Sequence, residues 1–245
     1  MKKYLPIILF VLGLGVVSAA IFFVVKGKKT ETVQEDETAL LKDVPLNQRP
    51  VAKLIPSDDG HWLKLIIEKL EIDAESLDYE LLYKLPDGRT QGVPGTVSLK
   101  GQKEIERDLL LGSESSGKFR YDEGVEGGTL TLRFRNDKGK LLTRFSTDFR
   151  LLSGVKSLDS KDSKLTVKLT KAPIAYFVVM ETFGVPQEAP GEIVAGPYGL
   201  FASDTLTLNG SIEISDGTLY RWTGSAWSDK DTVDTGIFIG VSSSE

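Results

Sequence analysis

The sequence contains no cysteine and only one histidine, His61, among its 245 residues. The lack of cysteine excludes disulfides, thiol catalysis, iron–sulfur clusters and cysteine-ligated zinc, and it excludes a lipoprotein anchor, which needs a cysteine to carry the lipid. A single histidine excludes every site that needs two. The chain also has no Gly-x-Ser-x-Gly elbow, no phosphate-binding glycine loop and no His-Glu-x-x-His motif. We therefore expect neither a metal nor a cofactor.

Acidic residues outnumber basic ones beyond the first 29 residues. That segment holds five lysines and no acid, whereas the rest of the chain has 25 basic and 35 acidic residues, a net charge of −10. Proteins that bind the phosphate backbone of nucleic acids carry basic patches. The composition therefore predicts that nucleic acid is not a partner.

Residues 4–25 form an uncharged run of 22 residues. A helix of this length is about 33 Å long, enough to cross a hydrocarbon core of about 30 Å. The alternative is a cleaved signal peptide, for which Val17-Ser18-Ala19 supplies small residues. Removable signals have apolar stretches of about 7–15 residues, and this run continues through residues 21–25. We therefore predict an uncleaved transmembrane anchor that contacts the lipid bilayer.

The residues that flank this run suggest its orientation. Lysines flank the run on both sides in nearly equal number, so the positive-inside rule favours neither orientation clearly. Residues 26–49 are polar, become acidic from Glu31 onward, and are predicted to be a flexible linker. No second apolar run returns the chain to the membrane. We therefore expect residues 1–3 to be a short cytoplasmic end and the C-terminal body to lie outside the cytoplasm.

Residues 50–152 have the rhythm of an antiparallel β-sandwich. About seven short apolar runs are separated by turns every 8–12 residues or so. The clearest are SLDYELLYK at 76–84 and the hairpin GTLTLRFRNDKGKLLTRF at 128–145. These segments resemble immunoglobulin-like or fibronectin-III-like modules of membrane-anchored bacterial surface proteins. The resemblance implies a surface module for spacing or binding, and without the cysteines and central tryptophan of antibody domains it covers the architecture alone.

Residues 153–245 are expected to form a second antiparallel β-rich domain, a meander or sandwich. Residues 153–164 read as an interdomain joint, and the glycine- and proline-rich segment 184–199 as a loop or an interrupted edge. Asn209-Gly210 between TLTL and SIEI predicts a two-residue hairpin, because both central residues of such a turn need positive φ. The fold class is therefore mainly β, with one N-terminal helix followed by two β domains.

Three aromatic residues near the C-terminus are the candidate ligand site. Tyr220 and Trp222 lie two apart on an expected strand, so they share a face, and Trp227 lies across the next turn. They suggest an aromatic platform that stacks on sugar rings. The alternative is that they pack the sheet face. The stretch YRWTGSAW also looks like hairpin segments of bacterial and phage surface proteins.

Other candidate chemistry has a simpler explanation in each case. Asp229, Asp231 and Asp234, like Asp159 and Asp162, suggest calcium ligands but lack the pattern of an EF-hand loop, so solvated acidic loops are favoured. Ser-x-x-Lys occurs at 115–118 and 153–156, which suggests a serine nucleophile, but both lie in glycine-containing loops. Carboxylates are numerous enough for a glycosidase pair, but nothing in the sequence marks one.

The sequence thus favours a non-catalytic, membrane-anchored extracytoplasmic protein with a role in adhesion, scaffolding or envelope structure. One alternative is a module that binds a glycan or a cell-wall polymer through Tyr220, Trp222 and Trp227. Another is an accessory subunit of a membrane or secretion complex, with another envelope protein as its partner.

Overall fold

The computed structural model describes residues 43–230 and 232–242. This part of the chain is mainly antiparallel β-structure, and its one helical element is a 3-10 turn, η1, at Leu46–Gln48. None of the described elements is a helix with the length and apolar character to span a membrane. The predicted cytoplasmic end, the anchor at 4–25 and most of the linker at 26–49 lie outside the described residues.

Nine strands form one sheet, called the main sheet, which runs in the order β16-β15-β17-β13-β12-β9-β8-β3-β4. Their bounds in that order are β16 Trp227–Ser228, β15 Thr218–Trp222, β17 Gly236–Val241, β13 Ile193–Ala202, β12 Tyr176–Glu181, β9 Leu141–Ser153, β8 Gly127–Arg135, β3 Ser76–Lys84 and β4 Thr90–Ser98.

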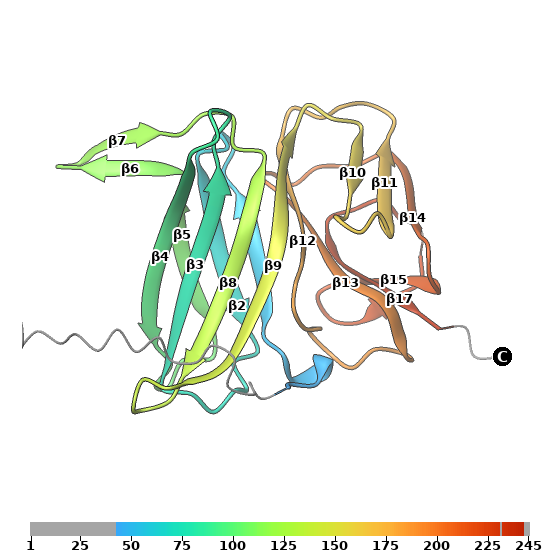
Figure 1. The fold of residues 1–245 in the computed structure, drawn as a ribbon. Coiled ribbons are helices and arrows are strands. Elements are labelled where there is room, and N and C mark those ends of the chain that lie inside the picture. The colour runs from blue at the N-terminus through green and yellow to red at the C-terminus, as the bar shows by residue number, and fades with distance from the viewer. Residues whose placement is uncertain (1–42, 231, 243–245) are drawn as a thin grey trace, which may run out of the picture. The chain divides into compact units, whose positions relative to one another are not determined.

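Three smaller sheets complete the structure (Figure 1). The first small sheet contains β1 (Val51–Pro56), β2 (Trp62–Glu68) and β5 (Ile105–Leu110). The second small sheet contains β10 (Ser157–Asp159), β11 (Leu165–Leu169) and β14 (Gly210–Ile214). The last is a hairpin, called the arm, made of β6 (Gly112–Ser115) and β7 (Lys118–Tyr121).

The first core lies between the first small sheet and the β4-β3-β8-β9 half of the main sheet. Alternation along β8 places Leu130, Leu132 and Phe134 in this core, where they meet Leu65 and Ile67 of β2. Side chains of a strand point to opposite faces in turn. β2 therefore buries every second residue, whereas β8 also buries Thr131 on its other face. The antiparallel, sandwich-like packing predicted for this segment is confirmed.

The second core lies on the opposite face of the main sheet, beneath the second small sheet. At β12 the two cores meet: Phe177 and Val179 belong to the second core, whereas Val178 and Met180 belong to the first. A strand that is buried on both faces is apolar throughout. This explains the unbroken apolar run of β12.

The predicted boundary between residues 152 and 153 falls inside β9, before the last residue of that strand. β9 extends to Ser153, and Leu152 pairs with Phe177 of β12. The described residues all belong to one compact unit. The two predicted bodies have a core each, but a continuous sheet joins them.

Two local predictions for the second body were wrong. The expected hairpin at Asn209-Gly210 does not form, because residues 205–208 contain no strand and β14 pairs with β11 instead. Glycine at position 210 allows β14 to lie close to β11, because a Cβ there would lie 1.9 Å from the carbonyl oxygen of Lys168. The segment expected as a loop or edge contains the start of β13, an interior strand between β12 and β17 that tolerates its glycine and proline at two bulges.

Candidate functional site

The predicted aromatic site is partly brought together. Trp222 and Trp227 are direct partners across β15 and β16, with ring centroids 5.4 Å apart and planes inclined at 62°. Both are half-buried, and Trp227 donates from Nε1 to the carbonyl of Gln187 at 3.4 Å. Tyr220 packs instead against a small cluster around Ile239, which Trp227 also borders. The edge-to-face tryptophan pair offers no common plane on which a sugar ring would lie.

The other sequence candidates lie apart from one another. Ser115 and Lys118 face each other on opposite strands at the tip of the arm, not on one helical turn. Asp234 accepts a hydrogen bond from Arg221 at 2.8 Å. Asp231 lies outside the described residues. Among the residues with described positions, no His, Cys, Asp and Glu side chains form a group of three or more suited to a metal ion.

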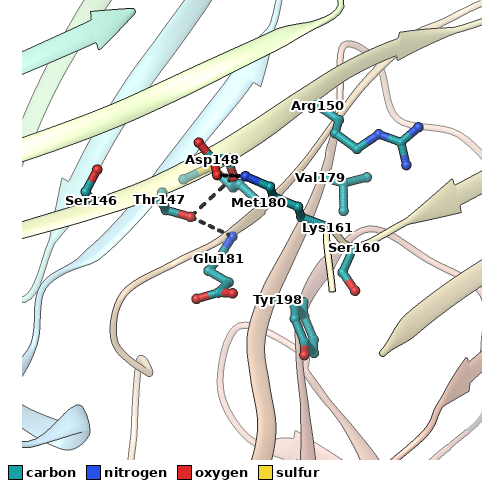
Figure 2. A pocket seen from close by; sticks show the side chains of 10 residues that line it. All are labelled: Ser146, Thr147, Asp148, Arg150, Ser160, Lys161, Val179, Met180, Glu181 and Tyr198. Atoms are coloured by element: carbon teal, nitrogen blue, oxygen red, sulfur yellow. Dashed lines mark hydrogen bonds and ion pairs between the residues drawn. The ribbon is translucent and has the colours of Figure 1, made fainter. Parts of the chain in front are cut away.

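A polar cavity of about 190 Å³ lies on the main sheet beside the turn between β10 and β11 (Figure 2). It is lined from β9, β12, β13 and that turn by the side chains of Ser146, Thr147, Asp148, Arg150, Ser160, Lys161, Val179, Met180, Glu181 and Tyr198. It is smaller than the roughly 300–1,000 Å³ typical of sites for drug-sized ligands.

Two carboxylates of this cavity have pKa values displaced in opposite directions. The ammonium group of Lys161 and the hydroxyl of Thr129 both donate to Asp148, and these bonds lower its pKa. Glu181 lies where desolvation, together with the charges of Asp162 and Asp148, raises its pKa. Displaced carboxylate pairs occur in acid–base catalysis, but structural networks produce them as well.

The remaining polar groups of the cavity hold the β10–β11 turn against the sheet. The hydroxyls of Tyr198 and Ser160 each donate to Asp162 at 2.6 Å. Burial and the bond to Asp162 raise the pKa of Tyr198. Ser146 shares a hydrogen bond of 3.1 Å with Thr131. Within the described chain neither serine is bonded to a histidine or lysine base, so the cavity is best explained as a polar joint between elements.

The arm was not predicted, and among the residues that the structure describes it carries the most exposed aromatic side chains. β6 and β7 pair only with each other and project from the body (Figure 1). Their tight turn is made by Ser116 and Gly117, whose φ angles of 52° and 76° are those of a two-residue hairpin. The dipeptide Ser-Gly between two short polar runs was the available sequence signal.

Four rings form a row along one side of the arm. Tyr121 stacks on His61 at 4.2 Å with planes 12° apart, and Phe119 lies 6.3 Å from Tyr121 with planes 10° apart. The edge contact of Trp62 with Phe119, at 5.5 Å, completes the row. Phe119 and Tyr121 remain 46% and 38% exposed. The structure thus presents two nearly parallel rings to solvent. Tyr121 is in contact with His61, which precedes β2, and Phe119 is in contact with Trp62, the first residue of β2.

The base of the arm is fixed by hydrogen bonds. Leu111 donates from its backbone to the carbonyl of His61 at 2.9 Å, and the hydroxyl of Tyr83 donates to Asp122, also at 2.9 Å. In the adjoining turn, Asp59 accepts from the Ser57 hydroxyl and from the backbone of His61, and these bonds lower its pKa to about 2. The imidazole of His61 lies 3.2 Å from Asp59.

No protein family, curated protein or solved structure matches this chain.

Proposed function

We propose that this chain is a non-catalytic, membrane-anchored protein whose β-rich body lies outside the cytoplasm and acts by binding. The observation that carries the proposal is the arm, which holds exposed aromatic rings away from the sheets. Aromatic side chains are costly to expose and are enriched where proteins bind partners. An arm that serves only to complete the fold would not need Phe119 and Tyr121 in solvent.

The sequence supports the membrane part of this proposal. The uncharged run at 4–25 has the length of a membrane span, and the acidic linker at 26–49 gives the body distance from the bilayer. The sandwich architecture is shared by many modules that space or present binding surfaces. An adhesive or scaffolding role in the cell envelope follows from the combination.

A glycan- or wall-polymer-binding module is the alternative that the structure favours most. It was first suggested by Tyr220, Trp222 and Trp227. Phe119 and Tyr121 are better suited to stacking on sugar rings than Trp222 and Trp227 are. Their rings are nearly parallel and more exposed, whereas the tryptophan pair is edge-to-face.

Protease shaving tests the location. The full chain with a C-terminal tag is expressed in cells, and protease is added to intact and to lysed samples. We expect loss of the tag from intact cells. A tag that survives in both intact cells and cells stripped of any outer layer, but not in lysates, would contradict an extracytoplasmic body and favour an accessory subunit on the inner side of the membrane.

The non-catalytic part has its own test. The detergent-solubilised full chain is incubated with polysaccharides and peptides, and the products are analysed by mass spectrometry. We expect every substrate to keep its length. Release of fragments that disappears in Glu181→Gln would show that the cavity is catalytic and would overturn this part of the proposal.

A further inference from the structure

We propose that a groove between η1 and residues 185–193 binds a small molecule that carries an ammonium group on an aliphatic chain. The groove has a volume of about 560 Å³, which lies within the roughly 300–1,000 Å³ typical of small-molecule sites. It shares no residue with the arm, so this inference goes beyond the binding role proposed above and is tested separately from it.

The walls of the groove are mostly aliphatic. Leu46 contributes from η1, and Val185, Pro190 and Ile193 contribute from the segment that leads into β13. Val185 is buried, and Ile193 packs against the small cluster around Ile239. Such walls favour a ligand with an aliphatic body, because binding removes apolar surface of both partners from water.

The two sides of the groove are held together by the protein itself. Glycine at position 184 allows the backbone after η1 to lie close, because a Cβ there would lie 2.3 Å from the carbonyl oxygen of Arg49. On the other side, Lys69 donates to the carbonyl of Val185 at 3.1 Å. A site that is ordered before binding loses less entropy when a ligand docks.

Charge selects the polar end of the ligand. In the described part of the chain, Glu188 is the only charged residue that lines the groove, and its carboxylate forms no hydrogen bond or ion pair there. Two neighbouring cations are already engaged, since Lys69 donates to Val185 and Arg49 donates to the carbonyl of Val44 at 2.7 Å. An ammonium group on the ligand supplies the partner that Glu188 lacks, whereas an anionic group is repelled.

The test compares probes that share a four-carbon chain and differ only in the polar end: n-butylammonium, n-butanol and butyrate. Each is titrated into the full chain in uncharged detergent micelles. Binding is followed by ligand-observed saturation-transfer NMR, and the signal of protein-free micelles is subtracted. We expect butylammonium to bind about fivefold more tightly than butanol, which is the gain from one solvent-exposed ion pair, and butyrate to bind more weakly than both.

Variants of the groove locate the site. Glu188→Gln keeps the size of the side chain but removes its charge, so butylammonium should then bind no better than butanol. Glu192→Gln is the matched control: it removes the same charge from an exposed neighbour that does not line the groove, and the fivefold preference should remain. Ala189→Leu adds three carbons to a residue that lines the groove, and we expect the binding of butylammonium and butanol to be lost together.

Several outcomes would overturn this inference. Equal affinity for butylammonium and butanol, or no binding of any probe, would remove the ammonium ligand. Equal loss of the preference in Glu188→Gln and Glu192→Gln would show that the acidic surface attracts cations without a specific site. Binding that appears only in Leu40→Asp would show that the linker of the chain itself occupies the groove. None of these results would bear on the arm, so the binding role proposed for it would stand.

Discussion

Replacing Phe177 by alanine tests whether the two cores unfold together. Phe177 lies in β12, the strand shared by both cores, and its side chain is 0% exposed. Truncating a buried phenylalanine to alanine costs about 3–5 kcal/mol, because apolar contacts are lost and a cavity remains. Since a domain of this size loses roughly 2–4 °C of Tm per kcal/mol, we expect Tm to fall by roughly 6–20 °C.

The assay is thermal unfolding of the full chain in detergent, followed by hydrogen exchange with mass spectrometry on separate peptides. β12 pairs with β9 on one side and with β13 on the other. Damage to it should therefore lower the protection of both small sheets. We expect exchange in β2 and in β11 to accelerate by similar factors of roughly two to four orders of magnitude.

Independent unfolding would refute this reasoning. If β11 lost protection in Phe177→Ala while β2 kept it, the shared sheet would not couple the unfolding of the two cores. The two predicted domains, divided at residue 153, would then unfold independently. Ile174→Ala is the matched control. Ile174 precedes the same strand but is fully exposed, so its truncation should leave Tm and exchange unchanged.

Two further substitutions probe local features. Asp59→Ala removes the acceptor for Ser57, and we expect it to cost about 1 kcal/mol at pH 7 in chemical denaturation, a figure discounted for the exposure of the side chain. Because the pKa of Asp59 is lowered to about 2 in the folded protein, its contribution is present above its ordinary pKa and is lost as the pH falls through about 2, so a deficit that does not shrink between pH 7 and pH 2 would contradict it. Gly210→Ala should cost about 1–3 kcal/mol, because its Cβ meets the Lys168 carbonyl; an unchanged midpoint would show that β14 does not approach β11 so closely.

The aromatic residues show what residue patterns in the sequence can and cannot predict about a site. Tyr220, Trp222 and Trp227 stood out because they are large and close in sequence, yet the same size makes them effective packing residues, and both tryptophans border the first core. The segment that contains Phe119 and Tyr121 is otherwise polar, so its residue pattern predicts no aromatic site. Their supporting rings come from His61 and Trp62, more than fifty residues earlier, and sequence spacing does not reveal that contact.

The sequence by itself determined many of the segments that become strands and where several of them turn. Alternating apolar residues predicted β8 and β9, and Asn136 holds the turn between them by accepting from the backbone of Lys138 and Lys140. Such features depend on neighbours a few residues away, so local chemistry specifies them.

Only the tertiary structure decided which strands became partners. Period-two alternation defines the faces of a strand but not the strand beside it, and so β14 pairs with β11 across more than forty residues instead of closing a hairpin at Gly210. The same holds for β12, whose apolar run was compatible with any core strand. β12 lies between two cores because each small sheet must bury its apolar face, and the main sheet packs against one small sheet on each of its two faces.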